Sequence, residues 1–302
     1  MKHLLKLQDL TKEEIIDILN IADQLKYENK RKIKHHILEG KTLGMIFTKA
    51  STRTRVSFET GIFQLGGQGL FLSGNDLQIG RGEPIEDTAR VLSRYVDGIM
   101  IRTFKQQDVE ILAKFSSVPV INGLTDYAHP CQVLADLMTI REYKGSFDNI
   151  KLCYIGDGNN MANSLIAGCC KMGIKISIAC PDEYRPDKKL TEYGYSTGLL
   201  EVTDDIEKAA SKADVLYTDV WASMGQESEK EVRNKTFKNF QINDKVMDMA
   251  NGDAIVLHCL PAHRGEEITV GVFEGHANEI FDEAENRLHA QKAVMVKLMQ
   301  DK

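Results

Sequence analysis

The chain has 302 residues, more than one compact domain usually holds, and this length predicts two domains of roughly 150 residues each. Hydrophobic residues make up 42% of the sequence and charged residues 27%, which is typical of a globular protein and not of a disordered one. With 38 basic and 44 acidic side chains, the formal charge of −6 argues against nucleic acid or an anionic membrane as a partner. Any bound anion must therefore be held by a local cluster of basic groups.

Six cysteines are spread along the chain without a CxxC pair, so the sequence indicates neither a disulfide framework nor a structural zinc site. The first ten residues carry charges and no apolar signal segment. No apolar run approaches the roughly 18 residues that a membrane span needs. We expect free thiols, no metal, no membrane partner and a location in the reducing cytoplasm.

In chain order, the first predicted element is a helix. Thr11 and Glu14 have capping-box spacing, and apolar residues recur at helical intervals from Ile15 to Leu25. Short apolar runs then alternate with longer helical stretches. The predicted strands cover 42–47, 68–72, 97–101, 118–121, 151–155, 174–180, 214–218 and 254–258. The further predicted helices cover 53–66, 84–95, 106–115, 131–143, 161–172, 204–212 and about 282–300.

This alternation predicts βαβ units, and therefore an α/β fold in which two domains each hold a parallel sheet flanked by helices. A polar, glycine-containing stretch at 145–149 predicts a boundary between one domain over 1–145 and another over 146–281. In open parallel sheets, ligands bind beyond the carboxyl ends of the strands. The residues that follow each predicted strand are therefore the candidates for function.

A Ser-Thr-Arg-Thr-Arg run at 51–55 follows the first predicted strand and opens a helix. A helix start offers free N–H groups and a positive dipole end, so two arginines there are unfavourable unless an anion lies among them. Arg102, at the end of the 97–101 strand, could add a second guanidinium with the bidentate geometry that phosphate favours. The simpler alternative is a Ser/Thr helix cap with surface arginines.

His129 precedes Pro130, which fits the first position of a helix, so His129 is expected at the helix cap. Because a helix N-terminus disfavours imidazolium, we expect a neutral His129 whose best use is to polarise a carbonyl. A capping histidine without a ligand is the alternative.

Two later strand ends are also unusual. The segment 219–225 holds a carboxylate, the single tryptophan and a turn-forming glycine, and predicts either a mobile loop or an ordinary surface connection. His258-Cys259-Leu260-Pro261, with His263 nearby, has too few well-spaced ligands for zinc. A Cys–His nucleophile pair is disfavoured because adjacent strand residues point to opposite faces. We expect Cys259 to line a cleft as a positioned thiol, with a buried inert cysteine as the alternative.

The turn Gly156-Asp157-Gly158-Asn159-Asn160 follows a strand and opens a helix, as a dinucleotide fingerprint does. Met161 stands where that fingerprint needs its third glycine, so the evidence for NAD is weak. Asn160 could instead contact a small polar substrate.

Taken in order, these motifs resemble those of the aspartate/ornithine carbamoyltransferase family. The matching pieces are Ser-Thr-Arg-Thr-Arg at 51–55, His-Pro-Cys-Gln at 129–132, Asp-Val-Trp-Ala-Ser-Met-Gly at 219–225, His-Cys-Leu-Pro at 258–261 and Phe-Asp-Glu-Ala-Glu-Asn-Arg-Leu-His at 281–289. The resemblance implies two α/β domains joined by interdomain helices, with the final helix over about 282–302 returning to the first domain. It also implies a homotrimer with active sites near subunit boundaries.

The resemblance implies transfer of a carbamoyl group from carbamoyl phosphate to an amine, without a cofactor. The residues it assigns to carbamoyl phosphate are Ser51, Thr52, Arg53, Thr54, Arg102, His129, Gln132, Cys259, Leu260 and Arg287, with Gln78 reaching a neighbouring subunit's site. Among them, Arg102, His129, Cys259 and Arg287 are the implied catalytic residues. The implied ornithine-binding residues are Asn160, Asp219, Ser223 and Met224. The Gly156–Asn160 turn is one residue shorter than in some relatives.

Ornithine is favoured over aspartate because the 219–226 loop contributes a carboxylate and no arginine. The implied products are citrulline and phosphate, in arginine biosynthesis. Putrescine or another amine is an alternative acceptor. A non-catalytic carbamoyl phosphate-binding paralogue and an NAD(P)-dependent dehydrogenase are the alternatives from other classes.

Overall fold

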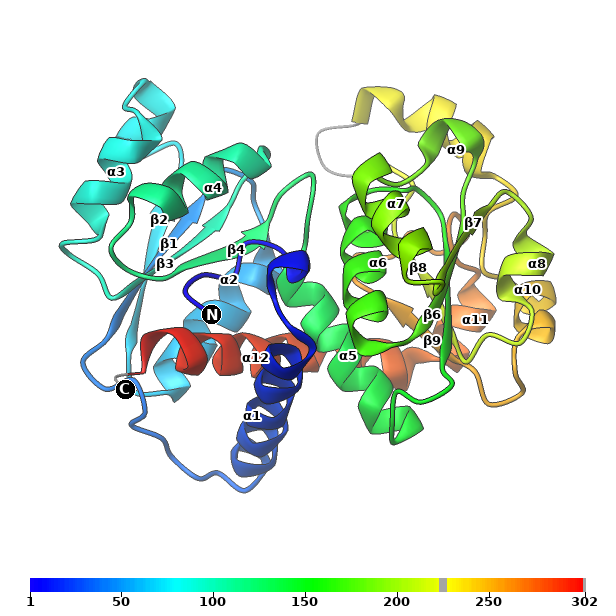
Figure 1. Cartoon of the computed structure of the whole chain (residues 1–302), viewed down its shortest axis with the longest axis horizontal. Helices are drawn as coiled ribbons and strands as arrows, with labels where there is room; N and C mark the ends of the chain where they lie inside the picture. The colour runs from blue at the N-terminus through cyan, green and yellow to red at the C-terminus, as the bar shows by residue number, and fades with distance from the viewer. Residues whose placement is uncertain (223–226, 301–302) are drawn as a thin grey trace. The chain divides into compact units, whose positions relative to one another are not determined.

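The structure is a computed structural model that describes residues 1–222 and 227–300, apart from the side chain of Glu227. The chain forms two compact units (Figure 1). One consists of Met1–Met138 with Asn286–Lys302, and the other of Thr139–Glu285. The division falls inside the helices α5 (Pro130–Lys144) and α12 (Ala277–Met299), whereas the predicted boundary at 145–149 lies in the turn that follows α5.

The first unit is built on a four-stranded parallel sheet with the strand order β2-β1-β3-β4. Its strands are β1 (Thr42–Phe47), β2 (Gln68–Ser73), β3 (Gly98–Arg102) and β4 (Val120–Leu124). A β-bulge shifts the register of β3 and β4 between Ile101 and Arg102. The extra residue, Gly123, lies on β4, so the bulge bends that strand beside Arg102.

Helices cover the first sheet on its faces (Figure 1). The helices of this unit are α1 (Lys12–Lys30), α2 (Thr52–Gln64), α3 (Ile85–Leu92), α4 (Gln106–Phe115) and parts of α5 and α12, with the short 3-10 helices η1 (Leu7–Asp9) and η2 (Gln78–Arg81). Ala89 of α3 and Leu112 of α4 pack in one buried cluster with Ile99 of the sheet. The capping box of Thr11 and Glu14 is confirmed at the start of α1.

The second unit is built on a five-stranded parallel sheet with the order β7-β6-β5-β8-β9. Its strands are β5 (Lys151–Ile155), β6 (Lys175–Ala179), β7 (Leu200–Thr203), β8 (Val215–Thr218) and β9 (Ile255–His258). The helices are α6 (Asn160–Met172), α7 (Lys188–Ser196), α8 (Ile206–Ala210), α9 (Lys230–Phe237), α10 (Asp244–Met249) and α11 (Val270–Gly275), with η3 (Asp182–Tyr184) and η4 (Glu227–Glu229). None of the described helices is both long and apolar enough to cross a membrane.

The predicted α/β fold with two helix-flanked parallel sheets is confirmed, and the eight predicted strands are present with small shifts at their ends. The sequence prediction missed β7 and the helices α7, α9, α10 and α11, and it began the last helix at 282 although α12 begins at Ala277. The reason is local polarity. Strand β7 is short and three of its four residues are only partly buried, and α9 has the polar sequence Lys-Glu-Val-Arg-Asn-Lys-Thr-Phe.

Both sheets share one topological feature that indicates where ligands bind. The chain adds β2 on one side of β1 and β3 on the other, and it adds β6 on one side of β5 and β8 on the other. The strand ends are in register there, with Phe47 beside Arg102 and Ile155 beside Thr218. Ligands of open parallel sheets bind at such points of reversal, so the segments after β1 and β3, and after β5 and β8, are the places to examine.

Gly158 marks a close approach in the turn after β5, and it gives a test of this packing. An added Cβ would lie 2.3 Å from the backbone nitrogen of Pro186, which cannot move as a side chain could. We expect Gly158→Ala to lower the free energy of unfolding by about 1–3 kcal/mol, as overpacking does. Chemical denaturation beside Gly252→Ala measures the effect, because a Cβ at Gly252 meets nothing within 4 Å. Equal stability of the two variants would contradict the prediction.

Candidate functional site

The candidate site of the first unit begins where β1 passes into α2. Ser51 is the N-cap of α2, and its hydroxyl accepts a hydrogen bond from the N–H of Thr54 at 3.2 Å. The backbone of Ser51 is extended, with φ −166°, so α2 starts directly after it. The first N–H groups of a helix lack partners within the helix and carry the positive end of its dipole. The start of α2 is therefore suited to an anion.

Two buried guanidiniums meet at the hydroxyl of Thr54. Arg102 Nη1 donates to Thr54 Oγ1 at 3.2 Å, and Arg287 Nη2 donates to the same oxygen at 3.3 Å. Arg287 Nη1 also donates to Gln132 Oε1 at 2.6 Å, and Gln132 in turn donates to Asp136 Oδ1 at 2.8 Å. All five residues are buried. The structure thus brings together four of the predicted site residues, Thr54, Arg102, Gln132 and Arg287, from four separate elements.

His129 lies in the same cationic surroundings and is 5% exposed. Burial holds the pKa of its imidazole well below the ordinary value, and the charges of Arg287, Arg102, Lys49 and Arg53 lower it further. A neutral His129 at pH 7 agrees with the expectation from the sequence. The cause differs, because burial and the neighbouring cations lower this pKa, whereas the sequence pointed to the helix dipole.

Sequence reasoning missed Lys49, a buried cation just before Ser51. Its Nζ lies 3.1 Å from Asp126 Oδ1 and 5.0 Å from the centroid of the Phe104 ring. It is 7% exposed and contributes to the low pKa of His129. The signal that could have identified Lys49 is its position, because it is a basic residue between a buried strand and a helix N-terminus suited to an anion.

The two arginines of the 51–55 run separate. Arg55 Nε pairs with Glu59 Oε1 at 3.1 Å, and its guanidinium lies 3.7 Å from the centroid of the Phe71 ring. Arg53 and Thr52 are exposed at the start of α2. Gln78 is exposed on η2, and within the described part of the chain no hydrogen bond joins it to the Ser51–Thr54 segment. Gln78 is therefore not brought together with the other predicted donor residues.

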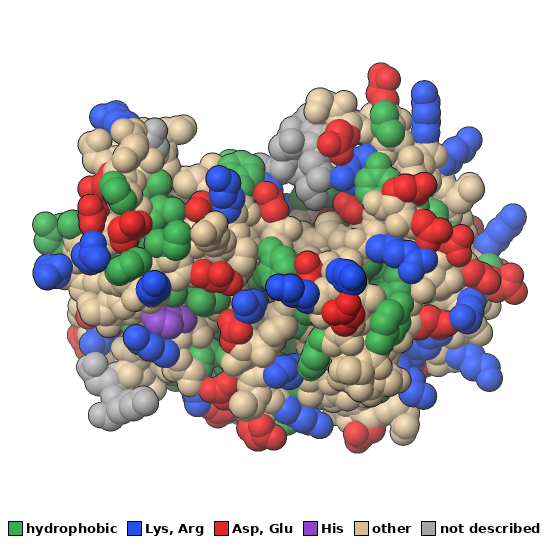
Figure 2. All heavy atoms as spheres, turned by 45° about the horizontal axis from the view of Figure 1, so that its top comes forward, with side chains coloured by type: hydrophobic (Ala, Val, Ile, Leu, Met, Phe, Trp, Pro, Cys, Tyr) green, Lys and Arg blue, Asp and Glu red, His purple; other side chains and the backbone are tan. Residues whose placement is uncertain are grey.

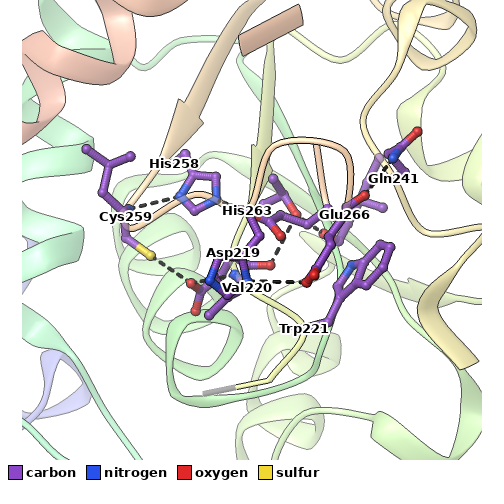
Figure 3. A network of polar contacts seen from close by, with 12 residues as sticks. Asp219, Val220, Trp221, Gln241, His258, Cys259, His263 and Glu266 are labelled. Atoms are coloured by element: carbon purple, nitrogen blue, oxygen red, sulfur yellow. Dashed lines mark hydrogen bonds and ion pairs between the residues drawn. The ribbon is translucent and has the colours of Figure 1, made fainter. Parts of the chain in front are cut away.

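The candidate site of the second unit is centred on Asp219, which follows β8 and is 7% exposed. Its Oδ1 accepts from the thiol of Cys259 at 3.1 Å and from the N–H of Val220 at 2.8 Å. Its Oδ2 accepts from Asn159 Nδ2 at 3.0 Å. Figure 3 shows Cys259 and Asp219 pointing toward each other. A carboxylate fixed by donors from the ends of β5, β8 and β9 suits a cationic group of a ligand.

Asn159, which sequence reasoning did not select, connects Asp219 to the start of α6. Its Oδ1 accepts from the N–H groups of Met161 at 2.8 Å and Ala162 at 3.3 Å, as an N-cap side chain does. The predicted Asn160 is the first residue of α6 and is partly buried. An asparagine directly before a helical pattern was the available signal for Asn159.

His258, the last residue of β9, and Cys259, which follows it, contact different partners: His258 lies against Glu267, whereas Cys259 donates to Asp219 (Figure 3). His258 Nε2 lies 3.0 Å from Glu267 Oε1, and His258 Nδ1 accepts the N–H of Leu260 at 2.9 Å. Since Nδ1 is the acceptor, Nε2 carries the proton and donates it to Glu267. Leu260 has φ +56°, the left-handed region, so its bond to His258 helps to hold a backbone that favours glycine. The imidazole therefore supports the Cys259–Leu260 turn and does not activate the thiol.

One group of described residues has the spacing of metal ligands. Atoms of His263, Glu266 and Glu267 lie within 4.8 Å of one another. Glu266 also lies 3.3 Å from Lys230 Nζ, and Glu267 bonds to His258 as described above. Protein partners therefore already balance both carboxylates. The predicted Ser223 and Met224, with Gly225 of the same predicted loop, lie outside the described residues.

Each unit thus carries charged groups at the point where its strand order reverses, cations in the first unit and a carboxylate in the second. This combination defines the chain as a two-domain α/β protein of the kind that binds small charged ligands beyond the carboxyl ends of parallel strands.

Comparison with known proteins identifies the family. The carbamoyl-P binding domain of aspartate/ornithine carbamoyltransferases matches residues 2–142, and the Asp/Orn binding domain of the same family matches residues 148–298. The chain belongs to the aspartate/ornithine carbamoyltransferase family.

Individual relatives match over almost their whole length. An ornithine carbamoyltransferase of Oceanobacillus iheyensis is 58% identical over 302 residues, covering 98% of this chain and 94% of the relative. The structure of ornithine carbamoyltransferase from Pyrococcus furiosus matches with a TM-score of 0.94 at 52% identity, covering 99% of this chain and 97% of the other. The anabolic ornithine carbamoyltransferase from Campylobacter jejuni matches with a TM-score of 0.93 at 46% identity, covering 99% of both chains.

The electrostatics of His129 give a prediction that needs no substrate. We expect the His129 ring to stay neutral at pH 6.5, and Arg287→Met to raise its pKa, because Arg287 is the largest of the cationic influences. NMR of the ring nitrogens across pH 5 to 8 measures both. Arg55→Met is the matched control, since Arg55 pairs with Glu59 and Phe71 instead. A His129 that titrates near 6.5 in the unaltered protein would show that the described burial and charges do not act as argued.

Proposed function

We propose that this chain is an enzyme that transfers the carbamoyl group of carbamoyl phosphate to the side-chain amine of L-ornithine, giving L-citrulline and phosphate. The observation that carries the proposal is the convergence of Arg102 and Arg287 on Thr54, beside a buried His129 of low pKa. This arrangement lies in the part of the chain that matches the family's carbamoyl-P binding domain. We assign carbamoyl phosphate to the first compact unit and ornithine to the second.

Phosphate is the leaving group, and negative charge grows on it as it departs. The site therefore needs positive groups that bind the phosphate more strongly at that stage. In the proposed reaction, Arg53, Arg102 and the first N–H groups of α2, with the hydroxyls of Ser51 and Thr52, hold the phosphate. Gln78 is assigned to the same group in a neighbouring copy, following the family pattern. Guanidiniums suit this role because their planar fork matches two phosphate oxygens at once.

The carbonyl oxygen becomes negative in the tetrahedral intermediate and needs donors placed in advance. Arg287, the Thr54 hydroxyl and neutral His129 are the groups assigned to this oxygen, and removing one such donor typically costs 10²–10³-fold in rate. The network from Arg287 through Gln132 to Asp136 supports their fixed positions. Gln132 is also assigned to the carbamoyl NH2 group, with the Leu260 carbonyl.

The attacking amine must lose its proton before it can react. A lysine-like amine has a pKa of about 10.4, so neutralising it near pH 7.4 costs roughly 4 kcal/mol. Asp219, with Asn160, Ser223 and Met224, is assigned to bind ornithine, and Cys259 is assigned a place beside its amine. Orientation of the two substrates and stabilisation of charge carry this reaction, so no metal or organic cofactor enters the proposal.

We further propose a homotrimer in the cytoplasm that acts in arginine biosynthesis. Large apolar side chains of the first unit are exposed: Val56, Phe63, Leu70, Phe71, Val91 and Tyr95. Figure 2 shows hydrophobic side chains gathered over the region of α3, next to side chains of both charges. Exposed apolar groups of this kind are what contact between copies of a chain would cover. The six cysteines, all within the described residues, form no disulfide with one another, which fits a reducing compartment.

A comparison of acceptors tests the function. Purified protein is given carbamoyl phosphate with ornithine, putrescine, lysine or N-acetylornithine, and each carbamoylated product is measured. We expect the highest kcat/KM with ornithine, because Asp219 suits a free amino group. Faster reaction of putrescine would reject the acceptor assignment, and no product from any amine would indicate a non-catalytic protein.

A reciprocal pair of variants tests the two half-sites. Arg53→Ala is expected to raise the Kd for carbamoyl phosphate by about 10- to 100-fold, because the phosphate loses a charge-assisted partner. Asp219→Asn is expected to raise the KM for ornithine by about tenfold or more while the Kd for carbamoyl phosphate stays unchanged. Calorimetry gives the first quantity and steady-state kinetics the second. If either variant weakened both substrates to the same extent, the assignment of one substrate to each unit would be wrong.

A further inference from the structure

Arg233 is a buried cation of the second unit that no motif singled out. It lies on α9 and is 6% exposed. Its Nη1 donates to Asp157 Oδ2 at 2.7 Å and to the carbonyl of Trp221 at 3.0 Å, and its Nε donates to Glu229 Oε2 at 3.0 Å. The guanidinium also lies 4.8 Å from the centroid of the Tyr184 ring. One side chain therefore links α9 to three other places in the unit, Asp157, Tyr184 and Trp221, and also bonds to Glu229, the N-cap residue of α9.

Two of these places belong to the strand ends that form the acceptor half-site. Trp221 follows Asp219 by two residues (Figure 3), and Asp157 precedes Asn159 by two residues. Asn159 in turn donates to Asp219 Oδ2 at 3.0 Å. Arg233 Nη1 therefore holds the segment after β8 against the turn after β5, which are the same two segments that Asn159 and Asp219 join.

We propose that Arg233 is a positioning residue for acceptor binding, which sets the place of the Asp219 carboxylate by holding the Trp221 carbonyl against Asp157. This inference rests on the proposed function, in which Asp219 binds the acceptor. Arg233 touches neither substrate in this account. It acts through the backbone of Trp221 and the turn that carries Asn159.

The chemistry of the contact requires an arginine. A guanidinium has donors in a rigid planar fork and can bind a carboxylate and a carbonyl together, whereas a lysine ammonium is a single point charge on a flexible stem. Burial raises the pKa of Asp157 to about 6, although the charge of Arg233 lowers it, so Asp157 is ionised at pH 7. Removing Asp157 would leave the buried Arg233 with Glu229 as its remaining carboxylate partner, whereas removing Arg233 would raise the pKa of Asp157 further.

The turn on the other side of this contact is also held firmly. The N–H of Gly158 donates to the carbonyl of Tyr184 at 2.8 Å, while the Tyr184 ring lies beneath Arg233. The turn that carries Asp157 is thus tied to Tyr184, and the Trp221 side chain is held by its Nε1, which donates to the Phe240 carbonyl at 3.3 Å. A shift of Arg233 would therefore act on the Trp221 carbonyl and, through the backbone, on Asp219.

Three variants test the proposal, namely Arg233→Met, Arg233→Lys and Asp157→Asn. We expect Arg233→Met to raise the KM for ornithine at least about tenfold, since a displacement of about 1 Å can cost a hundredfold in activity. Arg233→Lys should lose less, and the Kd for carbamoyl phosphate should stay unchanged in all three. Arg264→Met is the matched control. Arg264 also pairs with a carboxylate, Glu274 at 3.1 Å, and lies 3.8 Å from an aromatic centroid, that of Phe273.

The double variant Asp157→Asn with Arg233→Met adds a second readout. If the two residues act through one contact, the double variant raises the KM for ornithine no further than Arg233→Met alone. An unchanged KM in folded Arg233→Met, or an equal loss of carbamoyl phosphate binding, would overturn the proposal. If Arg233→Met fails to fold, unchanged KM values for ornithine in Arg233→Lys and Asp157→Asn would overturn the proposal. Absence of citrulline with the unaltered protein is a different result, which rejects the proposed function itself.

Discussion

Two buried guanidiniums that share one hydroxyl are the constraint on which the first unit depends. Arg102 and Arg287 both donate to Thr54 Oγ1, and both side chains are more than nine-tenths buried. Like charges repel strongly where water is scarce, so the arrangement favours any anion that can lie among them. The same charges, with burial, keep His129 neutral. One set of cations therefore both attracts an anion and prepares a neutral hydrogen-bond donor beside it.

The topology of the sheets makes this convergence possible. Arg102 and the start of α2 follow neighbouring parallel strands, while Arg287 comes from a helix 155 residues beyond its partner Gln132. The second unit uses the same reversal of strand order with the opposite sign of charge. There, donors from Asn159, Cys259 and the backbone of Val220 surround the carboxylate of Asp219.

Local pattern predicted much of this, because apolar runs and helix-capping residues act over a few positions of the chain. Eight of the nine described strands, all but β7, and the helix cap at Ser51 followed from it. The order of the strands in each sheet and the contact partners of the site side chains did not follow from it, since these depend on contacts between distant segments. Arg53 and Arg55 belong to one motif and look alike in the sequence. Arg55 differs because its side chain pairs with Glu59 and lies over the ring of Phe71. Arg233 lies in a polar helix that no sequence pattern predicted, so the burial of its side chain could not be predicted either.

The acceptor half-site illustrates why such distant residues matter to the chemistry. A carboxylate binds an amine with little reorganisation only if its position is already fixed, since ordering it on binding costs free energy. Three hydrogen bonds fix the oxygens of Asp219, and Arg233 fixes the backbone that follows it. Because the amine must also be neutralised at a cost of roughly 4 kcal/mol, little free energy remains to correct a misplaced partner. In the proposed function, the supporting contacts are thus part of the acceptor site even though they do not touch the acceptor.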